Sequence, residues 1–338
     1  MQAKLRKANR TRVGWMQKTV LITGGTGSFG NAFVGKALAS DIYSKIIVLS
    51  RDEMKQWEMQ SKFPDSRMRF FIGDVRDEGR LRRAMDGVHH VIHAAATKIV
   101  PMAEYNPFEA VKTNVLGATN VIDAAIDSGV ERVVALSTDK ASSPINLYGA
   151  TKLVSDKLFV AANNYSGKKK TIFSVVRYGN VMGSRGSLIP FLLSLSDSQK
   201  IPLTDERMTR FMITLDEGVG LVETAFKEMQ GGEIFVKKIP SMRVTDIIQA
   251  VRPDLQVETV GIRPGEKLHE QMIGPEEDQY TFDFCDHFRI FPAATLGMAR
   301  YEGHGGKPVP AGFSYSSDTN DEWMKPQDLA SWLSIFAK

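Results

Sequence analysis

"KTVLITGGTGSFGNAFVGKAL", residues 18–38, joins an apolar run, a glycine-rich turn and a helical pattern. The apolar run Thr19–Thr23 predicts a buried strand. Gly24, Gly27 and Gly30 follow in the spacing G-x-x-G-x-x-G, which suits a tight turn, a close approach of backbone to a diphosphate, and close packing of helix on strand. Free N–H groups and the dipole at the start of the helix would favour that anion. The stretch therefore predicts a dinucleotide-binding turn.

Strand and helix patterns alternate beyond this turn. Further strands are predicted by "KIIVLS" (45–50), "MRFFIGDVRD" (68–77), "HHVIHAAATK" (89–98) and "ERVVALST" (131–138), and one long helix by residues 106–129. This alternation predicts an α/β fold of the Rossmann type, a doubly wound parallel sheet that binds ligands at the carboxyl ends of its strands.

The alternation weakens after about residue 183, so we expect three parts. Residues 18–182 would form the nucleotide-binding domain. Residues 183–338 would form mainly a smaller C-terminal substrate domain, with some segments returning to the sheet. Residues 1–17 would be a disordered basic extension, because the first fifteen carry five Lys/Arg and no acid.

The composition is that of an ordinary soluble enzyme, with 43% hydrophobic and 24% charged residues. No apolar run approaches the roughly 18 residues that span a membrane. The single cysteine, Cys285, excludes an internal disulfide and indicates a reducing, cytoplasmic location. Since the net charge of +4 arises in the first fifteen residues, no nucleic-acid-binding face is expected. His89, His90 and His93 would point to different faces of a strand, so no metal is predicted.

The second strand bears on the choice of cofactor. It ends at Ser50, about 20 residues beyond the last glycine, where an NAD site places a carboxylate for the ribose. Ser50 and Arg51 suit a 2′-phosphate instead, and Asp52 is better placed to cap the next helix, although it competes as the ribose ligand. We therefore favour NADP over NAD. The predicted cofactor residues are Gly24, Thr26, Gly27, Ser28, Phe29, Gly30, Ser50, Arg51, Asp52, Lys55, Asp74, Val75, Ala94, Ala95, Lys98, Tyr148 and Lys152.

Tyr148 and Lys152, at i and i+4, lie on one face of a predicted helix that follows the fifth strand. An ordinary surface helix could carry such a pair by chance, but its position after a dinucleotide-binding sheet favours a catalytic role. We expect the lysine and a cationic nicotinamide to lower the pKa of the tyrosine, so that it can accept a hydroxyl proton.

Nine motifs extend the pattern: "TGGTGSFG", "SRDEMKQ", "GDVRD", "HAAATK", "STDKA…NLYGATK", "RYGNVMGSRGS", "MTRFMITLDEG", "GGEIFV" and "GIRPGEKLHE". With them the chain resembles the extended short-chain dehydrogenase/reductase family, and within it the branch of configuration-inverting UDP-N-acetylglucosamine 4,6-dehydratases. The resemblance runs from about Lys18 to Trp332. Retaining relatives carry Thr-Asp-Glu where this chain has Thr138-Asp139-Lys140, and the resemblance implies that Lys140 marks the inverting branch.

The resemblance implies an elimination of water between two hydride transfers. Tyr148 would accept the proton of the 4-hydroxyl, Lys140 as a neutral amine would remove the C5 proton, and Asp139 would protonate the leaving 6-hydroxyl, with Lys152 beside Tyr148. Because an ordinary lysine is charged at pH 7, we expect burial and the cofactor to lower the pKa of Lys140. Asp139 and Lys140 could otherwise be a solvated pair that closes a loop.

The resemblance also implies a UDP-sugar substrate. Glu266 could hold a ribose hydroxyl or pair with Arg263, and the sequence leaves both open. Thr97, where leucine is more typical, and Ser142–Ser143 are small departures from the family pattern. The implied substrate-binding residues are Lys98, Lys140, Asn180, Arg185, Thr204, Arg210, Arg263 and Glu266.

Three alternatives stay open. A 4-epimerase would have no use for Asp139 and Lys140, a retaining dehydratase would prefer glutamate at 140, and an NADP-sensing regulator would tolerate loss of all the reactive residues. The resemblance further implies a homo-oligomer, a dimer or a hexamer, and a place at the start of pseudaminic acid biosynthesis for flagellin glycosylation.

Overall fold

A computed structural model describes residues 18–293 and 305–336. The helices are α2 (Ser28–Ala39), α3 (Glu53–Lys62), α4 (Glu78–Ala84), α5 (Val100–Tyr105), α6 (Pro107–Val111), α7 (Gly117–Asp127), α8 (Leu147–Ala162), α9 (Leu188–Ser194), α10 (Leu215–Glu228), α11 (Val244–Val251) and α12 (Pro326–Phe336). The expected extension 1–17 lies outside the described residues.

The strands are β1 (Thr19–Thr23), β2 (Lys45–Ser50), β3 (Met68–Ile72), β4 (His90–His93), β5 (Arg132–Leu136), β6 (Ile172–Arg177), β7 (Asn180–Val181), β8 (Ile201–Leu203), β9 (Thr209–Ile213), β10 (Ile234–Lys237), β11 (Ser241–Arg243), β12 (Val257–Thr259), β13 (Gln271–Ile273), β14 (Thr281–Phe284), β15 (His287–Ile290), β16 (Lys307–Pro308) and β17 (Tyr315–Ser316).

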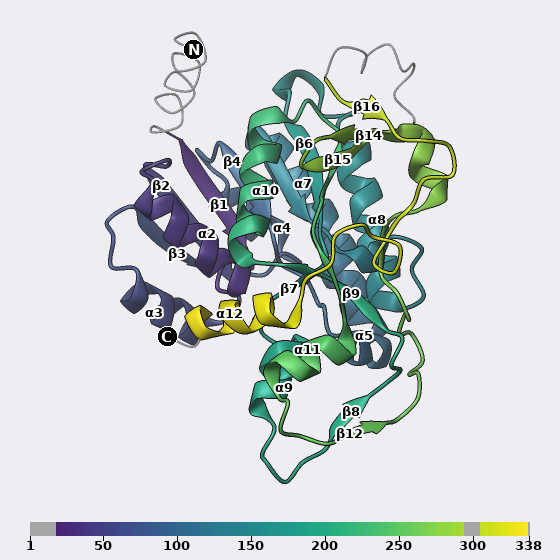
Figure 1. Cartoon of the computed structure of the whole chain (residues 1–338). Coiled ribbons are helices and arrows are strands. Elements are labelled where there is room, and N and C mark those ends of the chain that lie inside the picture. Colours follow the sequence, from purple (N-terminus) through teal and green to yellow (C-terminus); the bar gives the residue numbers. More distant parts are fainter. Residues whose placement is uncertain (1–17, 294–304, 337–338) are drawn as a thin grey trace, which may run out of the picture.

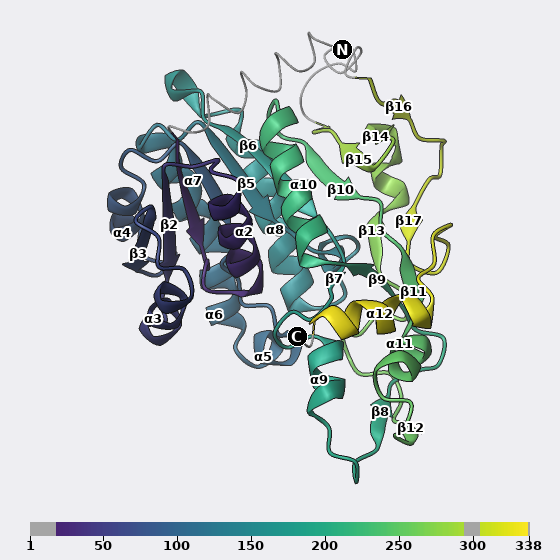
Figure 2. The ribbon, with the colours of Figure 1, turned by 60° about the vertical axis from the view of Figure 1, so that its left-hand side comes forward.

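Ten of these strands form one sheet, in the order β16-β14-β15-β10-β6-β5-β4-β1-β2-β3. The run from β10 to β3 is parallel, and β15, β14 and β16 extend it antiparallel. Helices α2 and α10 pack together on one face, and α4, α7 and α8 on the other (Figures 1 and 2). The predicted doubly wound sheet is therefore confirmed.

The central strands are buried on both sides, which explains their continuous apolar runs. Val20, Leu21 and Ile22 of β1 are fully buried in a core that covers the whole parallel part of the sheet. A second, smaller core joins α9, α11 and α12 to β8 and β9, below the sheet in Figure 1. Within residues 18–293 and 305–336, no helix is both long and apolar enough to cross a membrane.

The long helix predicted over residues 106–129 is divided. A π-helical stretch, Lys112–Leu116, separates α6 from α7. It directs the buried Asn114 inward, where the amide donates to the Thr97 carbonyl at 2.9 Å and to the Thr151 hydroxyl at 3.0 Å. The π-helical stretch thus coincides with the inward hydrogen bonds of Asn114, and the spacing of apolar residues cannot predict such a local change in the helix.

Candidate active site

A cavity of about 820 Å³ lies at the carboxyl ends of the parallel strands. Its lining includes residues that directly follow β1, β3, β4 and β6, together with the last residues of β2 and β5. Almost all predicted site residues line it. The three that do not are Gly30, Asp139 and Thr204.

The glycine turn forms the cofactor end of the cavity. Gly24 has φ +64°, and a Cβ there would lie 2.8 Å from the Ala95 backbone, so no side chain separates the two walls. Gly27 begins α2 without a side-chain cap, which leaves a helix N-terminus suited to a diphosphate. Gly30 serves packing, since its Cβ would meet the Gly25 carbonyl at 2.0 Å. These residues fit a dinucleotide.

Acidic and basic side chains both line the ribose end of the cavity. Asp52 caps α3 by accepting from the Lys55 N–H at 3.0 Å, and its carboxylate pairs with the Lys55 ammonium at 2.7 Å. Arg51 extends beside it with a side chain 64% exposed, 3.9 Å from Asp74. The Ser50 hydroxyl accepts a hydrogen bond from Gln56 at 3.0 Å. Asp52 is therefore engaged within the protein, and Arg51 lines the cavity with a largely exposed side chain.

Helix α8 brings Tyr148 and Lys152 into the cavity. Asn146 caps the helix by accepting from the Gly149 N–H at 2.8 Å. Without the cationic nicotinamide that the prediction assumed, the pKa of Tyr148 is not lowered: burial raises it to about 12, although nearby Lys140 and a hydrogen bond with Thr138 act in the opposite direction. Burial also lowers the pKa of Lys152.

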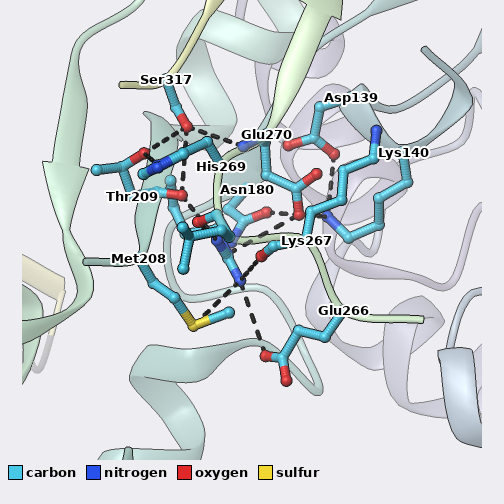
Figure 3. Close-up of polar contacts among 12 residues, drawn as sticks. Asp139, Lys140, Asn180, Met208, Thr209, Glu266, Lys267, His269, Glu270 and Ser317 are labelled. Carbon is cyan, nitrogen blue, oxygen red and sulfur yellow. Dashed lines mark hydrogen bonds and ion pairs between the residues drawn. The ribbon is translucent and has the colours of Figure 1, made fainter. Parts of the chain in front are cut away.

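Asp139 and Lys140 form part of a buried charge cluster. Asp139 is fully buried just behind the cavity wall, and its Oδ1 accepts from Lys140 Nζ at 3.0 Å. Glu270 Oε1 lies 3.2 Å from the same nitrogen, and Asn180 Oδ1 accepts from it at 3.4 Å (Figure 3). Asp139 and Lys140 are therefore not a solvated pair that closes a loop.

The pKa of Lys140, expected to be lowered by burial and a cationic cofactor together, is not lowered in the protein alone. Burial acts in the predicted direction, but the adjacent carboxylates of Asp139 and Glu270 outweigh it and raise the pKa of Lys140. Burial raises the pKa of Asp139. The cluster thus holds a charged lysine beside a carboxyl group that burial favours in its neutral form.

The sequence interpretation missed two residues of this cluster. Thr138 precedes the acid and donates from its hydroxyl to Asp139 Oδ1 at 2.9 Å. Glu270 ends the motif "GIRPGEKLHE" and is 2% exposed. The motif itself was the only signal for Glu270, because nothing in the local sequence pairs it with Lys140.

The substrate end contains the predicted arginines in different roles. Arg185 and Arg263 line the cavity, and Lys98 Nζ donates to the Arg185 carbonyl at 2.9 Å. Arg210 also lines it, but its guanidinium is largely occupied. It donates to three backbone carbonyl oxygens, those of Thr209, Lys267 and Leu268, at 2.7, 3.2 and 3.1 Å.

Glu266 pairs with Arg210 rather than with Arg263 in the described residues, and a contact with a ribose hydroxyl stays a prediction. Its Oε2 accepts from the Thr204 hydroxyl at 3.2 Å, and its Oε1 lies 3.7 Å from the Arg210 guanidinium (Figure 3 labels Glu266). Thr204 therefore does not line the cavity itself but holds Glu266, which does.

The buried histidines of β4 serve the two faces of the sheet. The His90 ring stacks on Phe226 of α10, and the His93 ring packs against Phe159 of α8. His93 Nδ1 shares a 2.9 Å hydrogen bond with the Thr23 hydroxyl. Both rings thus belong to the core.

Relatives of the chain match along almost its whole length. The family model described as "Polysaccharide biosynthesis protein" matches residues 20–292. The UDP-N-acetylglucosamine 4,6-dehydratase (inverting) of Campylobacter jejuni strain 81-176 is 53% identical over 92% of this chain and 96% of its own length. The UDP-glucose 4-epimerase of Rickettsia canadensis is 40% identical over 90% of this chain and 92% of its own.

Solved structures share the fold. Pen from Bacillus thuringiensis has a TM-score of 0.86 at 38% identity, covering 95% of this chain and 98% of that one. DesIV, a dTDP-glucose 4,6-dehydratase from Streptomyces venezuelae with NAD and TYD bound, has a TM-score of 0.66 at 27% identity, covering 74% and 86%. The chain belongs to the polysaccharide biosynthesis protein family and, as its motifs predicted, to the inverting UDP-N-acetylglucosamine 4,6-dehydratase branch of the extended short-chain dehydrogenases/reductases.

Proposed function

We propose that this protein is a hydro-lyase that converts UDP-N-acetylglucosamine to UDP-2-acetamido-2,6-dideoxy-β-L-arabino-hexos-4-ulose, with inversion at C5. The observation that carries the proposal is the ion pair of the fully buried Asp139 with the partly buried Lys140, beside the Tyr148 and Lys152 of a dinucleotide cavity. Oxidation or reduction alone requires no such pair, whereas elimination of water needs both a base and an acid.

Three residues of this chain each carry out one proton transfer. Tyr148 takes the proton of the 4-hydroxyl while hydride leaves C4, and the resulting 4-ketone acidifies the C5 hydrogen. Lys140, once neutral, removes that hydrogen, and the protonated carboxyl of Asp139 donates to the departing 6-hydroxyl, so that water leaves. C5 is then reprotonated from the opposite face. A bound nicotinamide would accept the hydride from C4 and return it to C6, so the cycle would be redox-neutral.

NADP is the proposed cofactor. The engagement of Asp52 by Lys55 and the exposure of Arg51 support a 2′-phosphate at the ribose end. DesIV, whose structure contains NAD, supports the coarser assignment of a nicotinamide dinucleotide. Gly24, Gly27 and the start of α2 would hold the diphosphate.

The UDP-glucose 4-epimerases are the main alternative by similarity. An epimerase uses the tyrosine and cofactor but leaves the Asp139–Lys140 pair without a task, and a retaining dehydratase would prefer glutamate at position 140. The higher identity of the inverting dehydratase, 53% against 40%, agrees with this preference.

We further propose the roles assigned above to the site residues, a division near residue 183 between the nucleotide and substrate parts, and a homo-oligomer. A 6-deoxy-4-keto product of this configuration would enter pseudaminic acid biosynthesis.

Proton NMR of the purified protein with UDP-N-acetylglucosamine in deuterated water, without added cofactor, tests the function. We expect a 6-deoxy-4-keto sugar of L-arabino configuration with deuterium at C5. Formation of UDP-N-acetylgalactosamine would favour the epimerase, and retention of the C5 configuration would favour a retaining dehydratase. Absence of any product, even with added NADP, would overturn the substrate assignment.

A further inference from the structure

The amino group of Lys140 is surrounded by three oxygen acceptors. They belong to Asp139, Glu270 and Asn180, at 3.0, 3.2 and 3.4 Å. An ammonium group has three N–H donors, so these contacts match its full capacity. A neutral amine has two N–H bonds and one lone pair. Lys140 must therefore lose one of these contacts before it can act as a base.

Glu270 is the member of this set that comes from the substrate-binding part of the chain. Its backbone N–H donates to the Ser317 hydroxyl at 2.9 Å, and its Oε1 lies 3.9 Å from the Arg210 guanidinium. Its other oxygen, Oε2, has no hydrogen-bond partner in the described parts of the chain. A carboxylate so deeply buried is costly unless a nearby charge compensates it, and Lys140 supplies that charge.

The segment Arg263–Glu270 is also hydrogen-bonded at two points to residues 141–146, which connect Lys140 to α8. Lys267 Nζ donates to the Ser142 carbonyl at 2.6 Å, and the Asn146 amide donates to the Gly265 carbonyl at 2.8 Å. Arg263 and Glu266, at the other end of this segment, line the cavity. The segment therefore spans from the substrate end of the cavity to the proposed carbon base.

We infer that Glu270 is a positioning residue that holds Lys140 in place as an ammonium ion in the free enzyme. A residue of the substrate-binding part of the chain thereby fixes the position of the proposed carbon base. The inference deepens the proposed function and rests on it, since it takes Lys140 as the carbon base. Glu270 acts through Lys140 and has no assigned contact with the sugar.

The charged and titratable groups that face Lys140 come from four elements. They are Asp139 in its own turn, Tyr148 on α8, Arg210 on β9, and Lys267 and Glu270 on the 263–270 segment. The carboxylates favour the ammonium form and the cations oppose it. Removing the Glu270 charge would leave only one adjacent carboxylate, so the pKa of Lys140 would fall.

Glu270→Gln tests this inference, because the amide oxygen can still accept a hydrogen bond while the charge is lost. The rate of Lys140 acylation by acetic anhydride, followed by peptide mass spectrometry in the free protein, reports the fraction of neutral amine. An opposite charge at this distance shifts a pKa by about 1–3 units. We therefore expect Lys140 to acylate roughly ten- to a thousandfold faster at a fixed pH below its pKa, with exposed Lys62 as an unchanged reference.

The reaction gives a second readout. Because Lys140 must be neutral to act as a base, kcat/KM rises with pH through its pKa, and Glu270→Gln should move this rise to lower pH. Glu276→Gln is the matched control: it is the same substitution on an exposed residue outside the cavity, and neither readout should change.

Unchanged acylation and an unshifted pH profile in Glu270→Gln would overturn the inference, as would a lower kcat at every pH without a shift. If that variant fails to fold, as judged by circular dichroism, Glu270→Asp should give an intermediate shift. Acylation does not depend on turnover. A wild-type enzyme that forms no 6-deoxy-4-keto sugar would therefore refute the proposed function, while acylation would still decide whether Glu270 controls Lys140.

Discussion

Asp139 shows how burial can prepare a single carboxyl group for acid chemistry. Its side chain is fully buried, and Oδ2 has no hydrogen-bond partner within residues 18–293 and 305–336. Burial penalises the charged form and raises the pKa of Asp139. This shift brings the protonated form, which a general acid needs, closer to neutral pH than in a surface aspartate.

Asp139→Asn removes this proton while keeping the shape of the side chain. We expect kcat to fall by about 10²–10⁴-fold, the usual contribution of a general acid. KM should change little, because asparagine keeps the shape and polarity of the side chain and only the acidic proton is lost. The measurement is the rate at which the C6 methyl signal appears in proton NMR.

The control for this prediction is Asp77→Asn. Asp77 caps α4 away from the cavity, and asparagine caps a helix as well as aspartate does. Its kcat should match that of the wild type. If Asp139→Asn also matched the wild type, another group would have to protonate the 6-hydroxyl.

At the scale of elements, the first turn of α8 and the Asp139–Ala141 turn touch through backbone. A Cβ at Gly149 would lie 2.2 Å from the Lys140 carbonyl oxygen and 3.1 Å from Pro144. Glycine at position 149 therefore allows Tyr148 and Lys140 to face the same cavity. Any larger residue must push the two elements apart.

Gly149→Ala should consequently harm both stability and activity. We expect the free energy of unfolding in urea to fall by about 1–3 kcal/mol through overpacking, and kcat to fall because Lys140 moves relative to Tyr148. Gly220→Ala, inside α10 with no atom within 4 Å of the added Cβ, should instead stabilise by about 0.5–1 kcal/mol with kcat unchanged. Equal effects of the two substitutions would show that the tight contact is unimportant.

The sequence allowed correct predictions for elements whose arrangement depends on residues close together in the chain. The strand, glycine turn and helix of residues 18–38 follow one another directly, so spacing alone predicted their arrangement. Prediction failed where residues far apart in the chain meet: Glu270 lies 3.2 Å from the Lys140 amino group, and the Arg210 guanidinium donates to the carbonyl oxygens of Lys267 and Leu268. No periodicity reports such long-range contacts.

At the scale of the whole molecule, the parallel sheet was predictable because buried strands carry long apolar runs. The antiparallel strands β14, β15 and β16, which widen it, are short and only partly apolar, and they gave no comparable signal. The cavity draws on both parts of the chain, with Gly24 and Tyr148 from the first and Arg210 and Arg263 from the second.

Several large apolar side chains on and around α5, α6 and α8 are exposed to solvent. Met102, Tyr105 and Phe108, on α5 and α6, are 53%, 85% and 79% exposed, and Leu116 and Val154 nearby are 52% and 45% exposed. These elements contact α8 or belong to it. Exposed apolar patches of this kind mark interaction sites, and the family resemblance predicts a homo-oligomer.

We therefore expect the wild type to sediment as a dimer or a larger oligomer in analytical ultracentrifugation. Tyr105→Glu combined with Phe108→Glu places two negative charges on this surface, and burying them unpaired would cost more than the contact returns, so the variant should sediment as a monomer. Trp57→Glu, at a 65% exposed residue of α3 outside this surface, is the control and should leave the mass unchanged. A monomeric wild type would refute the prediction, and a double variant that stays oligomeric would place the interface on another face.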